Sequence, residues 1–219
     1  MGVEEPSESG ARRRRSTDPR RKRDPERTRR LLLAAAAEEF SQRGYEGARV
    51  MRIAEAAGVG HQLITYHFGG KKGLYEALDE DLVRRSSEMF NAPEPLAEVM
   101  KECARWAFED ETWARLMVRE AMEGGFPIRD QRVAGLIEMV ERARLRQKSG
   151  ELDEDLDVGA LSVALLAACI APVILPAFAR AFVGLDPSSA DFQNLYVEQL
   201  GKLILALGRS GAGPGTPPA

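Results

Sequence analysis

Residues 53–68, IAEAAGVGHQLITYHF, decide the fold of this chain, because they encode two short helices joined by a tight turn. The first helix is predicted from about Val50 to Ala57 and the second from about His61 to Phe68. Between them, Gly58 can adopt the left-handed conformation that closes a helix, and Val59 can fill the angle between the two helices. This pattern predicts a helix-turn-helix motif, whose second helix is free to enter a DNA major groove of ~12 Å.

Helices are predicted on both sides of this motif. Asp24-Pro25-Glu26 is a helix start, with Asp as N-cap and Pro in the first turn, and this helix extends to about Gln42. Gly69-Gly70 interrupt the chain before a longer helix, which runs from Lys71 to about Met89. No segment shows sustained alternation with period two, so the chain is predicted to be all-α. Further helices are expected near Glu94–Asp110, Thr112–Glu123, Ile128–Lys148, Asp155–Phe182 and Ser188–Leu207.

The chain divides into two predicted domains between two tails. Residues 24–74 form the helix-turn-helix domain, and a linking helix at 71–89 leads into a larger helical domain at 85–209. Residues 1–23 are rich in arginine, and such runs cannot bury themselves, so this tail is expected to be disordered. Residues 210–219 are rich in Gly and Pro, and we expect them to be disordered as well.

Charge is distributed unevenly along the chain. Residues 1–74 carry 16 Lys and Arg against 10 Asp and Glu, whereas residues 75–219 carry 15 against 24. A basic segment suits a polyanion such as DNA, because neutralised phosphates supply most of the non-specific affinity. An uneven scatter of surface charge explains the same numbers equally well, so charge alone does not decide.

Other classes of function find little support in the sequence. The chain has two cysteines, Cys103 and Cys169, and two histidines, without a CxxC pair, so no metal site and no cofactor are expected. No nucleophile–base signature or phosphate loop occurs, so we do not expect an enzyme. The N-terminus lacks an apolar secretory signal, and a cytoplasmic location is expected.

One apolar segment raises the question of a membrane. Residues 158–179 contain no charged side chain over 22 positions, which is long enough to cross a bilayer. They include Pro172 and Pro176, however, and no strong basic flank fixes an orientation. Burial in a protein core or in an oligomer interface is therefore favoured, and no membrane partner is expected.

At this point the sequence resembles a known family. Residues 27–78, RTRRLLLAAAAEEFSQRGYEGARVMRIAEAAGVGHQLITYHFGGKKGLYEAL, are similar to the N-terminal domain of the tetracycline-repressor (TetR) family. The match covers about fifty residues in the expected order, so it is far more specific than an isolated IAxxAGV. The matching points are Ala36 with Phe40, Gly44-Tyr45, Ile53-Ala54, Ala57-Gly58-Val59, Tyr66-His67-Phe68, Lys71 and Leu74.

The resemblance implies roles for individual side chains of the second helix of the motif. His61, Gln62 and Thr65 match positions that face base edges, and their chemistry agrees, because Gln can bond adenine and Thr can touch a thymine methyl. Four further residues match positions near the sugar–phosphate backbone. Packing on the helix surface remains an alternative for Tyr66 and His67, as does a solvated side chain for His61. The four backbone positions are Leu63, Tyr66, His67 and Lys71.

Two positions depart from the family pattern. The family usually begins the first helix of the motif with Thr or Ser, whereas this chain has Ala48-Arg49, which should weaken capping by ~1 kcal/mol. Arg49 can still reach a phosphate. Position 65 more often carries Tyr, so the shorter Thr65 prevents an operator sequence from being borrowed from relatives.

For the second domain, the resemblance implies a ligand pocket and a dimer interface. Apolar side chains in two predicted helices are candidates for the pocket, although ordinary core packing explains each of them as well. Whether Arg119 and Glu120 are polar anchors or an ion pair stays open. The pocket candidates are Trp106, Phe108, Trp113, Met117, Met122 and Phe126. The interface, expected on the last two long helices, has as candidates Leu161, Leu165, Ala168, Leu195, Leu203 and Leu207.

The expected function is that of a DNA-binding transcription regulator. The leading hypothesis is a homodimeric repressor on a palindromic DNA operator, released by a small apolar effector. The alternative is a DNA-binding regulator without an effector, which acts through a protein partner or DNA architecture. The Arg-rich tail either enters a minor groove or gives only salt-dependent attraction.

Overall fold

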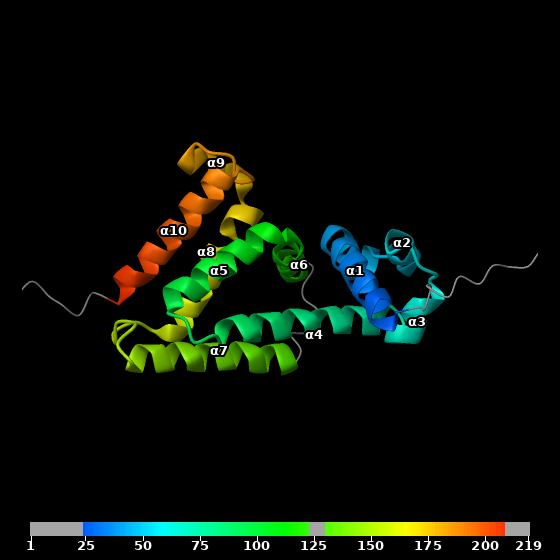
Figure 1. The fold of residues 1–219 in the computed structure, drawn as a ribbon, viewed down its shortest axis with the longest axis horizontal. Helices are drawn as coiled ribbons and strands as arrows, with labels where there is room; N and C mark the ends of the chain where they lie inside the picture. The colour runs from blue at the N-terminus through cyan, green and yellow to red at the C-terminus, as the bar shows by residue number, and fades with distance from the viewer. Residues whose placement is uncertain (1–23, 123–129, 209–219) are drawn as a thin grey trace, which may run out of the picture.

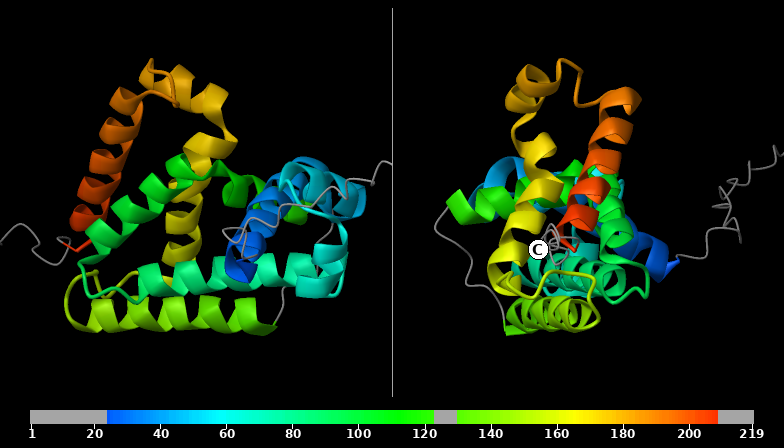
Figure 2. Two further views of the ribbon diagram at one scale, coloured as in Figure 1. Left: turned by 45° about the vertical axis from the view of Figure 1, so that its right-hand side comes forward. Right: turned by 90° about the vertical axis from the view of Figure 1, so that its left-hand side faces the viewer.

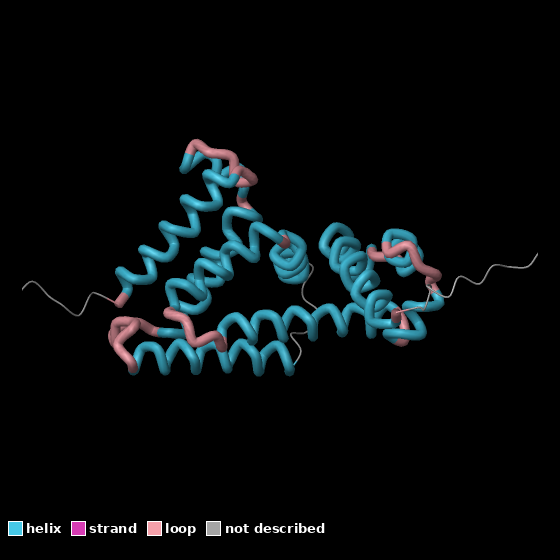
Figure 3. Tube along the Cα trace, in the orientation of Figure 1, coloured by secondary structure: helices cyan, strands magenta, loops and turns pink. Residues whose placement is uncertain are grey.

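The computed structural model describes residues 24–122 and 130–208, and every regular element within them is an α-helix (Figures 1 and 3). The all-α class predicted from the sequence is therefore confirmed. The two predicted tails lie outside these residues. The helices are α1 Pro25–Gly47, α2 Val50–Ala56, α3 Gln62–Phe68, α4 Lys71–Phe90, α5 Leu96–Glu109, α6 Glu111–Met122, α7 Asp130–Lys148, α8 Val158–Ile174, α9 Pro176–Val183 and α10 Ala190–Leu207.

Helices α1 to α3 pack around a core of their own. Helix α1 begins as predicted, with the Asp24 carboxylate accepting hydrogen bonds from the backbone N–H groups of Glu26 and Arg27 at 3.1 Å each. Near its end, Gly44 leaves helical geometry at φ 68° and turns the chain toward α2. We call the buried apolar residues here the N-terminal core: Leu32, Leu33, Ala36, Phe40, Ala48, Ile53, Ala54, Ile64, Leu74, Tyr75, Ala77 and Leu116.

Helix α4 belongs to both halves of the molecule. Its first turns supply Leu74 and Tyr75 to the N-terminal core, and its last turn packs Met89 and Phe90 against a second core. Helix α6 also joins the halves, because Leu116 completes the N-terminal core while α6 packs beside α1. Figure 1 shows α4 extending from below α1 to a point above the middle of α7.

The second domain is organised around α5. Helices α8 and α10 both pack on α5 (Figure 2). The Tyr196 hydroxyl of α10 donates a hydrogen bond to the Ala168 carbonyl of α8 at 2.7 Å. Both outer helices begin at a side-chain cap: Asp157 accepts from the N–H of Ala160 at 2.7 Å, and Ser189 caps α10. The buried centre of this domain includes Met100, Cys103, Cys169, Leu200 and Ile204.

The predicted helix Asp155–Phe182 is wrong, because the chain breaks at Leu175 into α8 and α9. The axes of these two helices differ by 91°. Pro176 has no N–H to continue the ladder and disfavours helical geometry at the preceding residue, which here adopts φ −126° and ψ 50°. Among the described residues no single helix passes a membrane-span test, and only the bent pair α8–α9 meets it by length and composition.

Candidate DNA-binding surface and adjoining cavity

Helix α3 presents a polar face to solvent from a fixed base. Ile64 points into the N-terminal core with 1% of its surface exposed, and this anchors one side of the helix. The opposite side carries His61, Gln62 and Thr65, which are all exposed, and Tyr66, whose exposure of 80% is far above that expected for a packed aromatic ring. These side chains form one exposed polar face of α3.

Two neighbouring residues are placed differently from the sequence-based prediction. Leu63 was expected to face outward, but it is half-buried and packs against the N-terminal core, because the short helix has apolar neighbours on two sides. His67 is also only half exposed, with its ring 5.0 Å from that of Tyr66. The exposed polar face of α3 is therefore narrower than expected and consists of His61, Gln62, Thr65 and Tyr66.

Lys71 lies beside α3 at the start of α4. Its ammonium donates a hydrogen bond to the Glu46 carbonyl at 3.2 Å and lies 4.6 Å from the centre of the Tyr45 ring. Helix α4 can follow α3 this closely only because residue 73 is glycine: a Cβ there would meet the Phe68 carbonyl oxygen at 1.8 Å. The close approach fixes the position of Lys71 relative to the exposed polar face of α3.

A carboxylate from α1 supports the start of α2. Helix α2 has no side-chain cap of its own, as its sequence predicted. Instead, Glu39 accepts the backbone N–H of Arg49 at 3.0 Å and the Nε–H of Arg52 at 2.7 Å. The Arg52 guanidinium also donates to the Gly47 carbonyl at 2.8 Å. Sequence reasoning missed this group, because Glu39 and Arg52 are 13 positions apart and no local pattern joins them.

This arrangement leaves the side chain of Arg49 available. It is exposed, and among residues 24–122 and 130–208 it has no side-chain hydrogen bond or ion pair. Arg49 thus offers a cation at the same end of the molecule as the α3 face. A phosphate contact is the role that its predicted position suggests.

A cavity of about 590 Å³ lies in the second domain. Trp106, Trp113 and Met117, three of the predicted pocket residues, line it, and the two indole rings stack 4.8 Å apart. Its walls come from α4, α5, α6, α7 and α8. The other lining residues are Leu82, Val83, Ser86, Ser87, Phe90, Asn91, Cys103, Glu120, Ala121, Arg132, Gly135, Leu136, Glu138, Met139 and Leu166.

Two of the other pocket predictions are not met, and the third cannot be placed. Phe108 packs among Phe192 and Tyr196 instead, at ring distances of 6.2 Å each, because it lies on a different face of α5 from Trp106. Met122, at the end of α6, is 83% exposed and does not line the cavity. Phe126 lies outside the described residues.

An ion-pair network forms part of the cavity wall. Arg132 of α7 binds Asp79 of α4 and also Glu120 of α6, the latter at 2.8 Å, and Glu120 accepts a hydrogen bond from the Tyr75 hydroxyl. Burial by itself lowers the pKa of Arg132, but the hydrogen bonds that its guanidinium donates to Glu120 and Asp79, together with the charges of both carboxylates, outweigh burial and raise this pKa. Glu120 thus forms an ion pair with Arg132 of α7, a partner that the sequence did not suggest.

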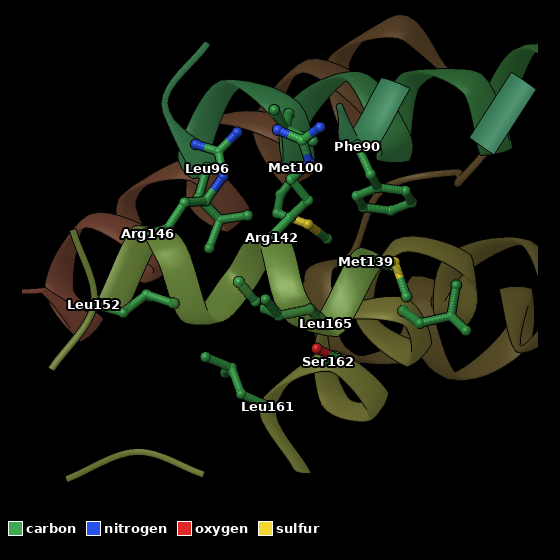
Figure 4. Close-up of a pocket in the computed structure, with 13 residues that line it drawn as sticks. Phe90, Leu96, Met100, Met139, Arg142, Arg146, Leu152, Leu161, Ser162 and Leu165 are labelled. Atoms are coloured by element: carbon green, nitrogen blue, oxygen red, sulfur yellow. The ribbon is translucent and has the colours of Figure 1, made fainter. Parts of the chain in front are cut away.

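A much smaller chamber adjoins this cavity between α5, α7 and α8 (Figure 4). It shares Phe90, Met139 and Leu166 with the larger cavity and has a volume of about 30 Å³. Arg146 lines it too, but its guanidinium is already bonded to Glu151 at 3.0 Å. A space of this size holds about one or two waters and excludes an organic ligand.

The predicted interface residues divide into two groups. Leu195 and Leu203 on α10 are 42% and 53% exposed, so they are available to a partner. Leu165 is only 8% exposed and belongs to the core of its own chain, which overturns its assignment to an interface. Its side of α8 faces α5, where it fills space between the helices. The other three candidates are half-buried against the same core: Leu161, Ala168 and Leu207.

Comparison with known proteins finds a family match for the N-terminal helices. Residues 32–78 match the family model described as "Bacterial regulatory proteins, tetR family". The HTH-type transcriptional repressor AcnR of Corynebacterium glutamicum is 40% identical over 62 residues, which are 28% of this chain and 32% of that repressor. AcnR of Corynebacterium efficiens matches to the same extent. The chain thus spans about a third of the length of the curated relatives that it matches.

Solved structures match over nearly their whole length. A transcriptional regulator of Streptomyces coelicolor, SCO4942, has a TM-score of 0.65 at 23% identity, covering 80% of this chain and 97% of that one. FadR of Bacillus subtilis, solved with stearoyl-CoA, has a TM-score of 0.55 at 19% identity, covering 78% and 96%. Likeness at this identity concerns the fold. Residues 32–78 therefore match the N-terminal domain of the tetR family of bacterial regulatory proteins, and for the rest of the chain the likeness is one of all-helical fold.

Proposed function

We propose that this chain is a dimeric transcriptional repressor that reads an operator with α3 and that a ligand in the cavity releases it. The observation that carries the proposal is the exposed polar face of α3 on a buried base: Gln62 and Thr65 face solvent, whereas Ile64 is 1% exposed. A helix that displays amide and hydroxyl groups in this way suits the major groove, where base edges present donors and acceptors.

Affinity and specificity are proposed to come from different side chains. Gln62 and Thr65 reach base edges, and Tyr66 reaches the sugar–phosphate backbone beside them. Arg49 and Lys71 supply charge for phosphates on either side of α3, which positions the helix but carries no sequence information. The ties of Lys71 to the Glu46 carbonyl and the Tyr45 ring hold its ammonium at a fixed place.

The repressor is proposed to act as a homodimer through α8 and α10. Exposed apolar side chains lie on both helices, among them Val163 at 71% and Leu203 at 53% exposure. Burying such surfaces against a second copy is favourable, and a two-fold dimer presents two reading helices to a palindrome, ~34–36 Å apart. Leu195 and Leu203 remain in the proposed interface, whereas Leu165 does not.

A ligand in the cavity is proposed to act on the reading helix through α4 and α6. Both helices contribute to the cavity wall and to the N-terminal core. Glu120 links the two places, because it binds Arg132 at the cavity and accepts the hydroxyl of Tyr75, whose ring packs edge-on against Phe40 at 4.9 Å. A ligand that shifts α6 therefore disturbs the base on which α3 rests.

The test is selection of bound fragments from random DNA at two salt concentrations. Gln62→Ala is expected to relax the choice of base at one position per half-site, with a loss of ~1–3 kcal/mol in discrimination. Arg49→Ala and Lys71→Ala are expected to weaken all sequences alike and to reduce the salt dependence of binding by about one counterion per site.

A control separates local contacts from net charge. Arg105→Ala removes the same charge from α5, far from α3, and is expected to leave binding unchanged. If the protein selects no sequence, or if Gln62→Ala and Arg49→Ala cause the same sequence-blind loss, the proposed division of roles is wrong.

A further inference from the structure

The wall of the large cavity carries an excess of negative charge. Among the described residues, the charged side chains that line it are those of Glu120, Glu138 and Arg132. The guanidinium of Arg132 is already shared between Glu120 and Asp79, which is 6% exposed, so one positive charge faces two carboxylates. Glu138 adds a third carboxylate at the exposed side of the cavity, where it accepts a hydrogen bond from the Asn91 side chain at 3.1 Å.

Two indole rings lie in the same wall. Trp106 and Trp113 stack with an interplanar angle of 17°. The face of an indole attracts a cation more strongly than any other side-chain ring does, and the attraction increases when water is excluded.

We propose that the cavity binds lipophilic organic cations, with an apolar or aromatic body and one delocalised positive charge. The cavity volume of about 590 Å³ is typical of sites for drug-sized molecules. The apolar body would lie among Leu82, Met117 and Leu136, and the charge would lie near the indole rings and the surplus carboxylates. This inference specifies the ligand class for the cavity of the proposed repressor and rests on that function only for its regulatory consequence.

The same charged groups in the cavity wall disfavour an anionic ligand of the same shape. The positive charge of Arg132 is already neutralised by Asp79 and Glu120, so it offers an anion little net attraction, and drawing it away from them would leave a buried carboxylate without its partner. Glu138 would repel it at the exposed side. The cavity should therefore distinguish two molecules that differ in the sign of their charge alone.

The two tryptophans provide the measurement, because they are the only ones in the chain and both line the cavity. Tetraphenylphosphonium and tetraphenylborate are probes of nearly identical shape and opposite charge. Titrated into the full-length protein without DNA, tetraphenylphosphonium is expected to quench tryptophan fluorescence saturably. Tetraphenylborate is expected to bind at least about tenfold more weakly, as opposite signs of a charge interaction at this range require.

A matched pair of variants on α7 tests the origin of this preference. Glu138→Gln keeps an acceptor for Asn91 but removes a charge from the cavity wall, so it should weaken tetraphenylphosphonium about three- to tenfold and strengthen tetraphenylborate. Glu141→Gln removes the same charge three positions further along the same helix. Glu141 does not line the cavity and pairs with Arg144 in solvent, so this control should shift neither probe by more than about twofold.

The outcomes separate this inference from the proposed function. Equal or tighter binding of tetraphenylborate, equal effects of the two variants, or quenching by neither probe would overturn the cation preference while leaving DNA binding intact. If tetraphenylphosphonium binds with the expected charge preference but leaves affinity for the selected operator unchanged, the proposed ligand class is supported. The proposal that a ligand in the cavity releases the DNA is then wrong.

Discussion

Replacing Glu39 by Gln should loosen the start of α2 and thereby the whole helix-turn-helix. The Glu39 carboxylate is 10% exposed and accepts the Arg49 N–H at 3.0 Å and the Arg52 Nε–H at 2.7 Å. Helix α2 has seven residues and no cap of its own, so this carboxylate from α1 is the side chain that satisfies its first backbone donor. The amide of Gln keeps the shape of the group but loses its charge.

The magnitude follows from the contacts that the charge strengthens. A hydrogen bond to a charged group contributes about 1.5–3 kcal/mol, against about 0.5–1.5 kcal/mol for a neutral one. Both donors meet the same oxygen, Oε1, so an amide oxygen there can still accept both, but as hydrogen bonds to a neutral group. We therefore expect Glu39→Gln to lower the free energy of unfolding by about 1–2 kcal/mol. For a chain of this size, each kcal/mol corresponds to about 2–4 °C in Tm.

The effect should depend on pH in a defined direction. Burial raises the pKa of Glu39, but the hydrogen bonds from Arg52 and the Arg49 N–H and the charges of Arg52 and Arg43 outweigh it, so the folded pKa lies below the ordinary value of 4.5. The contribution of Glu39 is therefore fully present above its unfolded pKa and is lost as the pH falls through the folded pKa. The difference between wild type and Glu39→Gln should be constant near neutrality and shrink below pH 4.5.

Urea unfolding of both proteins across this pH range is the assay. Glu38→Gln is the matched control, since Glu38 is the exposed neighbour on α1 and contacts Gln42 of its own helix. Arg52→Ala should cost a similar amount, and the double variant with Glu39→Gln should cost clearly less than the two losses added together. If Glu39→Gln is no less stable than Glu38→Gln, or if the double variant is additive, the cross-helix support is refuted.

Two further changes have expected outcomes. Gly58→Ala should lower the free energy of unfolding by about 1–2 kcal/mol, because the residue has φ +65° while nothing lies within 4 Å of the added Cβ, so backbone strain is the whole effect; urea unfolding measures it. Leu203→Glu should shift the protein from dimer toward monomer in sedimentation or light scattering, whereas Leu145→Glu, a leucine of similar exposure on α7, should not. If Leu203→Glu and Leu145→Glu have the same mass in solution, α10 does not form the interface.

The helix-turn-helix could be predicted from sequence because its determinants are local. Asp24 caps the helix that follows it directly, and Gly58 makes the turn at its own position with φ 65°. The buried face of α3 followed from the spacing of its apolar residues, with Ile64 inward as expected. The burial of Leu63 was not predicted. Helix α3 has seven residues and contacts both α2 and α4, so its buried side chains are not confined to one apolar stripe.

The second domain was harder to predict because its determinants are distant in sequence. Pro172 and Pro176 look alike in the sequence, yet the first remains within α8 and the second starts α9 after a bend. Which proline ends the helix depends on how α8 packs on α5. In the same way, Trp106 and Phe108 lie two positions apart on one helix, and only tertiary packing shows that the first lines the cavity and the second packs on α10.

The charge of the cavity wall shows why a ligand class had to come from the structure. Asp79, Glu120 and Arg132 lie on three different helices, and the acid excess exists only because the fold brings them together. Glu120 has a second partner in Tyr75, which belongs to the N-terminal core. The proposed coupling between the cavity and the base of α3 runs through this one carboxylate, and no pairing of neighbours in the sequence predicts its two contacts.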